Sequence, residues 1–297
     1  MRLRFLFLCL LIFTLWSAAQ QASDAANNWK EVEQAMARPG QPQPGGVIRF
    51  GMPRKDLHVT LNGVAIKPGL ALGSWVAFLG HGTEAMVMGD LVLTEDEISP
   101  VMASLQKAGV QEAALHNHLV GESPHVMYMH LASHGDPVQI AKAIHDAVAL
   151  TKTPGPDSTP APAAADLGFD QSRVEQALGR SGKVNGGILQ FSVPRAEQIT
   201  DSGIRLPPSM GVATAINFQP TGGGKAAITG DFVLVGSEVN QVIKALTDNG
   251  IQVTALHSHM LNEEPRLFFM HFWANDDALK LARGLRAALD KTASARS

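Results

Sequence analysis

The order of hydrophobic and polar residues predicts short strands followed by amphipathic helices. Apolar or alternating runs between glycine and polar clusters predict strands over Gly46–Met52, Ser74–Leu79 and Glu84–Val92. The apolar residues then take up helical spacing, at Ile98, Val101, Met102 and Leu105. The first half of the chain is therefore expected to combine a sheet with helices.

Polar residues and glycines mark the expected helix ends. Thr94 and Glu97 have the spacing of a capping box before the helix, and Gly109 follows its last turn. Asp136 directly precedes Pro137. This pair predicts the start of another helix, because aspartate caps helices and proline suits their first turn.

The second half of the chain repeats the first. GGVIRFGMPR at Gly45 matches GGILQFSVPR at Gly186, and MGDLVL matches TGDFVL further along. The same offset of 141 residues separates His130 from His271. Asp277 holds the position of the second helix cap. Self-similarity at this period indicates two structural copies of one unit.

We predict an α+β fold, in which each of two tandem copies is an antiparallel sheet with helices on one face. The copies are expected over residues 28–150 and 169–291. The stretch 151–168 is rich in proline, alanine and small polar residues, so we expect a semi-extended linker there.

The first 19 residues predict a secretory signal peptide. Arg2 and Arg4 precede an apolar run that ends at Trp16, and the small residues at 17–19 offer a cleavage site. The run is short for a bilayer span, so we expect an exported periplasmic or extracellular protein without a stable transmembrane anchor. Cys9, the single cysteine, lies inside the run, so the mature chain would have no thiolate ligand or disulfide.

Composition and charge narrow the classes of function. The chain is 45% hydrophobic and 17% charged, which suits a folded core. Its formal net charge is −3 and it has no basic run, so a nucleic-acid partner is not expected.

A motif of His-x-His, Glu, Pro and Met-His occurs once in each copy. It reads ALHNHLVGESPHVMYMH in the first copy and ALHSHMLNEEPRLFFMH in the second. The histidines and the glutamate recur while their neighbours change, which indicates a metal site in each copy. The candidate metal ligands are His116, His118, Glu122, His130, His257, His259, Glu263 and His271.

Strand geometry predicts how the ligands of one copy converge. Residues two apart on a strand share a face, so the histidines of each His-x-His do too. A hairpin loop over Leu119–Pro124 would return the chain with Tyr128 opposite His116 and His130 opposite Ala114. His130 is then a diagonal neighbour of His116, within reach of one ion. The loop glutamate can fold over the same face.

Three imidazoles and one carboxylate suit a divalent ion such as Zn²⁺, Fe²⁺ or Mn²⁺, and the residues do not select among these. Four protein ligands would make a structural zinc site. If the glutamate does not touch the ion, a position stays free for water, whose pKa falls to about 7 on zinc. A polar pocket in which the imidazoles bind an anion is the alternative.

Other residues near the motifs are expected to have structural roles. Met129 and Met270 point away from the neighbouring histidines by strand alternation, so we expect them in the core. Asp90 and Asp231, in the two Gly-Asp pairs, are interpreted as turn or cap residues that at most orient a ligand histidine.

Two family resemblances follow from these motifs. The His-x-His-x3-Glu spacing resembles the first metal motif of cupins, but the third histidine comes too soon after the glutamate for a cupin barrel. The two motifs and the Gly-Asp strands before them resemble an exported family typified by the mycobacterial lipoproteins LppY and LpqO. That resemblance covers both copies and implies export and a duplicated domain, but no particular activity. This chain lacks the lipobox of those lipoproteins.

Two functions remain open. One is a metal-dependent hydrolase or oxygenase, in which Glu122 or Glu263 is a fourth ligand or a general base. The other is a non-catalytic envelope protein that holds a metal ion or a small ligand. The expected partner is therefore a small molecule or an envelope component, and no catalytic residue is assigned.

Overall fold

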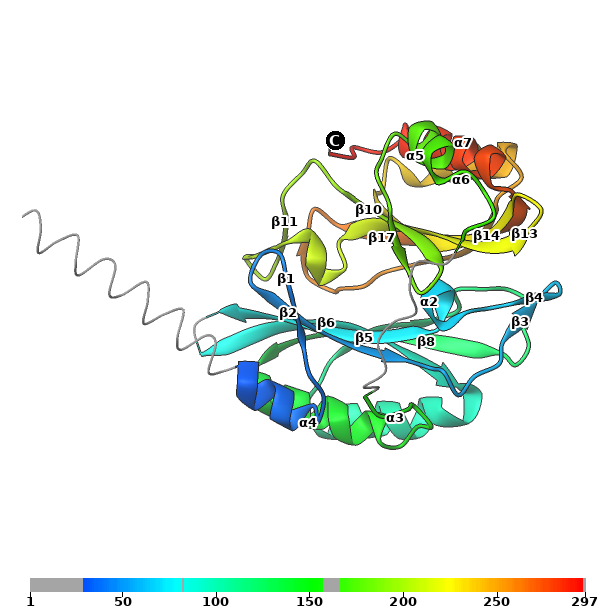
Figure 1. Cartoon of the computed structure of the whole chain (residues 1–297). Helices are drawn as coiled ribbons and strands as arrows, with labels where there is room; N and C mark the ends of the chain where they lie inside the picture. Colours follow the sequence, from blue (N-terminus) through cyan, green and yellow to red (C-terminus); the bar gives the residue numbers. More distant parts are fainter. Residues whose placement is uncertain (1–28, 82, 157–165, 296–297) are drawn as a thin grey trace, which may run out of the picture.

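The computed structural model describes residues 29–81, 83–156 and 166–295. The predicted signal peptide, with Cys9, and the middle of the linker lie outside these residues. Each repeat forms one six-stranded antiparallel sheet, and the two sheets pack face to face with helices on their outer sides (Figure 1). This confirms the prediction of two tandem α+β repeats. Among the described residues, no helix has the length and apolarity needed to cross a bilayer.

The first repeat begins with a helix over residues 29–35. Its main sheet has the order β1-β2-β5-β6-β8-β7. The strands are β1 (Gln41–Gln43), β2 (Val47–Pro53), β5 (Gly73–His81), β6 (Glu84–Thr94), β7 (Glu112–His116) and β8 (Val126–Gly135). The remaining elements are β3 (Thr60–Leu61), β4 (Val64–Ala65), α2 (Pro68–Ala71), α3 (Glu95–Lys107) and α4 (Pro137–Val148).

The second repeat has the same strand order, β9-β10-β13-β14-β17-β15. These strands are β9 (Lys183–Asn185), β10 (Ile188–Pro194), β13 (Ala213–Gly222), β14 (Lys225–Val235), β15 (Gln252–His257) and β17 (Leu267–Asp277). A small sheet contains β11 (Ile199–Asp201), β12 (Ile204–Leu206) and β16 (Glu263–Glu264). The helices are α5 (Gln171–Leu178), η1 (Pro208–Met210), α6 (Val239–Asp248) and α7 (Ala278–Leu289).

The predicted helix caps are present. Glu97 accepts a hydrogen bond from the backbone N–H of Thr94 at 3.0 Å, as the capping box requires. Asp136 and Asp277 accept hydrogen bonds from backbone N–H groups in the first turns of α4 and α7. Gly109 follows α3 with φ 76°, a conformation that glycine adopts without strain.

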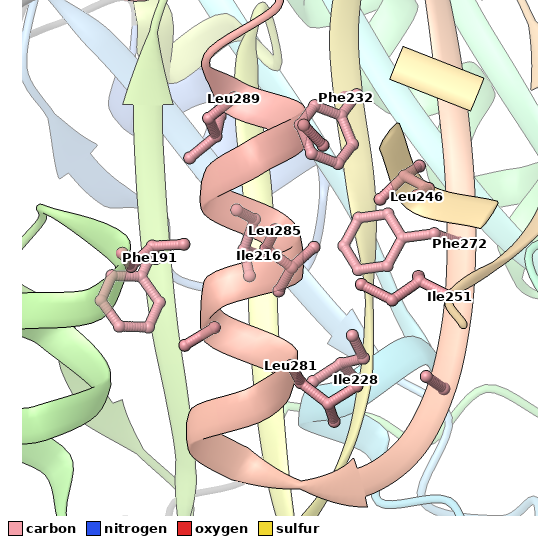
Figure 2. Close-up of a cluster of buried hydrophobic side chains, with 14 of the residues drawn as sticks. Phe191, Ile216, Ile228, Phe232, Leu246, Ile251, Phe272, Leu281, Leu285 and Leu289 are labelled. Carbon is pink, nitrogen blue, oxygen red and sulfur yellow. The ribbon is translucent and has the colours of Figure 1, made fainter. Parts of the chain in front are cut away.

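The outer face of each sheet packs against its helices. Figure 2 shows this core in the second repeat, where Leu281, Leu285 and Leu289 of α7 face Phe232 of β14 and Phe272 of β17. The three leucines are four residues apart, so they form one stripe on the helix. Burial of this stripe holds α7 on the sheet.

Alternation along β8 and β17 sends side chains to opposite faces of each sheet. Met129 and Leu131 lie in the helix-side core, whereas Tyr128 and Ala132 face the other sheet. Met270 lies in the helix-side core of the second repeat. The prediction that these methionines pack away from the histidines is confirmed.

Two apolar clusters fill the space between the sheets. The first inner cluster contains Leu61, Leu70, Leu119, Val126 and Tyr128 of the first repeat with Ile188, Ala227 and Trp273 of the second. The second inner cluster contains Ile199, Leu206, Met260, Leu267 and Phe269 of the second repeat with Val47, Met86 and Ala132 of the first. Each repeat therefore buries apolar surface against the other, which joins the two sheets.

Hydrogen bonds also connect the repeats. The Gln219 side chain donates to the carbonyl of Ala65 at 2.7 Å and accepts from the backbone N–H of Lys67 at 2.9 Å. At the edge of the sheets, the Thr254 hydroxyl donates to the carbonyl of His118 at 2.6 Å. These bonds fix the sheets in one relative position.

A buried arginine ties each sheet to the helix that follows its central strand. Arg54 is fully buried, and its Nη1 lies 2.6 Å from Glu97 and 2.7 Å from the carbonyl of Val92. Arg195 pairs with Glu238 at 2.7 Å in the second repeat. Because a buried charge without its partner is costly, loss of either pair would destabilise its repeat.

Replacing one of these arginines is expected to destabilise the protein strongly. Arg54→Met should lower the free energy of unfolding by about 3–5 kcal/mol, because it leaves the carboxylate of Glu97 buried without its partner. Arg195→Met should act in the same way, and urea denaturation measures both. Lys142→Met is the control, since Lys142 is 70% exposed in its pair with Asp146, and it should cost no more than about 0.5 kcal/mol. An Arg54→Met effect as small as that of the control would contradict a structural role.

Candidate metal centre

Each repeat contributes three histidines from equivalent elements. One is the last residue of the edge strand β7 or β15, one follows two positions later, and one lies inside the neighbouring strand β8 or β17. In chain order they are His116, His118, His130, His257, His259 and His271.

The strand register agrees with the predicted one. Tyr128 pairs with His116, and Ala114 pairs with His130. In the second repeat, His271 pairs with Ala255 in the same way. The histidines of each repeat therefore converge on the inner face of its sheet.

The two sets of histidines meet in a single cluster between the sheets. The closest ring pairs across the repeats are His116 with His257 at 3.6 Å between centroids, His118 with His271 at 3.8 Å and His130 with His259 at 3.7 Å. If each histidine is replaced by its equivalent in the other repeat, the His116–His257 pair maps onto itself. The His118–His271 pair then maps onto the pair of His259 and His130. The cluster therefore has a pseudo-twofold axis, the pattern of an isologous contact. The sequence predicted one ligand set in each copy, and the packing of the copies brings the sets together.

Two aspartates extend the cluster. Asp90 lies inside β6 and Asp231 inside β14, and each pairs in register with a histidine of the neighbouring strand. Asp90 lies 3.3 Å from Nε2 of His118, and Asp231 lies 3.0 Å from Nε2 of His259. Their interpretation as turn or cap residues was wrong. The signal for the site was an acidic residue in an apolar strand of both copies, since aspartate is depleted from strand interiors.

The glycine before each aspartate has two roles. A side chain on Gly230 would come within 2.0 Å of the carbonyl oxygen of Ala215, so only glycine fits there. The carbonyl of Gly230 lies 2.7 Å from Nδ1 of His271, and that of Gly89 lies 3.2 Å from Nδ1 of His130. A carbonyl only accepts, so each Nδ1 donates a proton to it, and the Nε2 lone pair is left for the cluster.

The ligand atoms lie close enough to share cations. In three groups, all ligand atoms lie within 4.8 Å of one another: Asp90, His116, His118 and His130; His116, His257 and His271; and His130, His257 and His259. The second and third groups draw on both repeats. Several residues of these groups have a buried atom without a hydrogen-bond partner: Oδ1 of Asp90, and Nε2 of His116, His130 and His271. Oδ1 of Asp231, which lies outside the groups, is also buried without a partner. Buried lone pairs without partners are rare in folded proteins, and a bound cation would satisfy them.

The structure does not bring the loop glutamates into these groups. Glu122 lies 2.9 Å from Nδ1 of His125 and accepts a hydrogen bond from the backbone N–H of Val126 at 3.4 Å. Glu263 accepts from the backbone N–H of Leu267 at 3.0 Å. Each carboxylate therefore holds the start of the returning strand, and neither belongs to the three ligand groups.

Burial sets the protonation of the cluster. It lowers the pKa of all six histidines, and neighbouring imidazoles lower several of them further. Burial lowers the pKa of His259 to about 3, against the opposing charge of Asp90. Burial also raises the pKa of Asp231 to about 6, although His271 opposes the shift. At neutral pH the imidazoles are thus neutral, the form that binds metals.

Tyr128 makes the two halves of the cluster unequal. It is the single tyrosine of the chain, and its buried ring stacks on His118 with 3.3 Å between centroids. Its hydroxyl is buried without a hydrogen-bond partner. In the second repeat Phe269 stacks on His259 in the same way, at 3.4 Å.

Acidification is expected to destabilise the metal-free protein. Unfolded histidines take up protons near about pH 6.5, whereas the lowered pKa values keep the six buried ones neutral. The unfolded state then binds more protons below this pH, so stability falls as the pH drops. The raised pKa of Asp231 acts in the opposite direction, but it is one group against six.

Urea denaturation of the metal-free protein between about pH 8 and about pH 5 tests this. The unfolding midpoint should fall steeply below about pH 6.5, and a His134→Gln variant should show the same trend because His134 lies outside the cluster. A midpoint that does not change over this range would show that the six histidines are not buried as neutral groups.

Tyr128→Phe is expected to stabilise the metal-free protein by about 1 kcal/mol, because it removes a buried hydroxyl that has no partner. The reciprocal change Phe269→Tyr should destabilise it by a similar amount, because it buries a hydroxyl at the equivalent position. Thermal or urea unfolding measures both variants. If Tyr128→Phe destabilises the protein instead, the hydroxyl makes a stabilising hydrogen bond.

Comparison with protein families matches the Domain of Unknown Function (DUF1259) twice, at residues 30–150 and 172–291. No curated protein matches the chain. Among solved structures, EtuB from Clostridium kluyveri is 11% identical, with 84% of this chain and 90% of that chain covered and a TM-score of 0.19. The trimeric bacterial microcompartment shell protein PduB is 12% identical, with 84% and 88% covered and a TM-score of 0.20. TM-scores this low support no conclusion about this chain. The two matches to the domain span most of the sequence, and the chain therefore belongs to the DUF1259 family, with two tandem copies of its domain.

Proposed function

We propose that this protein binds divalent metal ions in a centre formed jointly by its two repeats. The interrepeat centre consists of Asp90, His116, His118, His130, Asp231, His257, His259 and His271. The observation that carries the proposal is the convergence of buried, unpartnered nitrogen and oxygen atoms from both sheets. Such atoms cost free energy in a metal-free core, and binding of a cation would offset that cost.

The chemistry of the interrepeat centre favours a cation over an anion. Imidazoles bind anions when they are protonated, but burial lowers the pKa of these six. His130 and His271 use their Nδ1 protons on glycine carbonyls, so they present lone pairs to the centre. Asp90 and Asp231 add negative charge, which would repel an anion.

The set of ligand types favours a borderline divalent ion. Imidazole nitrogen and carboxylate oxygen suit Zn²⁺, Fe²⁺ and Mn²⁺, whereas soft ions such as Cu⁺ prefer sulfur. Met129 and Met270 lie in the helix-side cores, so they supply no thioether ligand to the centre. The donor set does not choose among the three ions.

A metal-dependent hydrolase or oxygenase is a second candidate function. Two observations favour it. The ring of Tyr128 stacks on His118 and its hydroxyl is buried without a partner, and the side chain of His118 is 14% exposed. The loop glutamates Glu122 and Glu263 each accept a hydrogen bond from a backbone N–H group of the returning strand, and Oε2 of Glu122 is buried without a partner.

Export to the periplasm or the medium is part of this proposal. The signal-peptide pattern of residues 1–19 supports it, as does the resemblance to the family typified by LppY and LpqO. The finer family name remains a prediction.

Metal analysis of the full chain, purified after expression with added Zn²⁺, Fe²⁺ and Mn²⁺, tests the proposed function. At least one equivalent of a divalent ion should copurify. His116→Ala combined with His257→Ala removes a direct ligand from each repeat. Loss of a hydrogen-bond partner of a ligand typically weakens metal binding by roughly 10–100-fold, so this double variant should weaken it by more than that.

The matched control combines His125→Ala with His134→Ala. These histidines are 43% and 36% exposed and lie outside the centre, so the metal content should not change. A metal-free wild-type protein, or equal metal loss in the control, would refute the proposed function.

A further inference from the structure

We propose that the interrepeat centre holds two divalent ions close together, and not one. This inference rests on the proposed function, and it adds the number of ions and the coupling between them. It differs from the sequence prediction of one independent site in each copy, because ligands of both repeats are shared.

The number of ligands exceeds what one ion can use. Zinc in proteins takes four ligands, and octahedral ions take six. The interrepeat centre has eight ligating side chains, and each repeat supplies one aspartate and three histidines. In the first repeat these four ligand atoms all lie within 4.8 Å of one another, which is a complete set for one ion.

The carboxylates of Asp90 and Asp231 lie beside different histidines of the interrepeat centre. Asp90 lies 3.3 Å from His118 and 4.0 Å from His130. Asp231 lies 3.0 Å from Nε2 of His259, but its 4.0 Å contact with the equivalent histidine is to Nδ1 of His271, which donates to the carbonyl of Gly230. The pseudo-twofold axis exchanges these two sets. Asp231 itself belongs to none of the three ligand groups, so the second ion would be held by the groups that contain His257, with Asp231 beside His259.

Shared histidines connect the two sets. His116 belongs to the group around Asp90 and also to the group with His257 and His271. The rings of His116 and His257 stack at 3.6 Å on the axis between the two sets. The sites are thus neighbours, comparable to two-metal sites in which the ions lie about 3.5–4 Å apart.

Charge predicts unequal affinities for the two ions. As metal ligands, the two aspartates are carboxylates with a combined charge of about −2, which one divalent ion neutralises. The second ion enters a centre that is already neutral, and it is repelled by the first. The second equivalent should therefore bind more weakly than the first.

Titration of the metal-free full chain with Mn²⁺ tests the inference, with binding followed by metal analysis and by electron paramagnetic resonance. Two equivalents should bind in two steps, and the second should produce an exchange-coupled spectrum, because the ions lie within about 4 Å. Asp90→Asn and Asp231→Asn should each reduce the stoichiometry to one equivalent and abolish the coupled spectrum. Asp146→Asn is the matched control, since Asp146 is exposed on α4, and it should retain both equivalents.

The outcomes separate the two proposals. One equivalent in the wild-type protein overturns the two-ion centre and leaves the proposed function intact. Two equivalents without a coupled spectrum also overturn it, because the ions then occupy separate sites. No bound Mn²⁺, Zn²⁺ or Fe²⁺ refutes the proposed function as well. The wild-type titration decides the question even if the aspartate variants fail to fold.

Discussion

The apolar layer between the two sheets is the constraint on which the rest of the structure depends. The first inner cluster, with Tyr128 and Trp273, and the second, with Phe269 and Ala132, exchange under the same pseudo-twofold axis as the histidines. This layer draws both sheets together and excludes water from the ligands between them. The lowered histidine pKa values, the unpartnered lone pairs and the convergence of two ligand sets all follow from that burial.

The features predicted from the sequence are those that depend on local geometry. Strand alternation gave the pairing of His116 with Tyr128 and the inward direction of His130, because the side chains of a strand alternate with a fixed period. Cap chemistry placed the starts of α3 and α4, because Thr94 and Asp136 satisfy backbone N–H groups of the first turn. The α+β class followed from the same periodicities, repeated in both halves.

The features that the sequence did not reveal depend on contacts between distant residues. Nothing in the local pattern says that His116 stacks on His257, because that contact requires the packing of one complete sheet on the other. Asp90 was interpreted as a turn residue because it follows a glycine, although that glycine is needed for close approach of the neighbouring strand. Glu122 was assigned to the ion because it recurs with the histidines in both copies, and the sequence did not show that its carboxylate accepts a hydrogen bond from the backbone N–H of Val126.

Duplication of the repeat supplies a second sheet that buries the aspartate and histidines of the first. A single repeat would expose the inner face of its sheet, and water would then solvate its aspartate and histidines. Phe269 and Met260, for example, are fully buried in the second inner cluster, to which the first repeat contributes side chains. In the tandem chain the stretch 151–168 links the two repeats covalently. The two ligand sets therefore associate within one molecule, at a high effective concentration. The two halves differ at Tyr128 and Phe269, whereas the three histidines and the aspartate of the cluster occur in both. The shared cluster, and not either copy alone, is therefore the chemical unit of this fold.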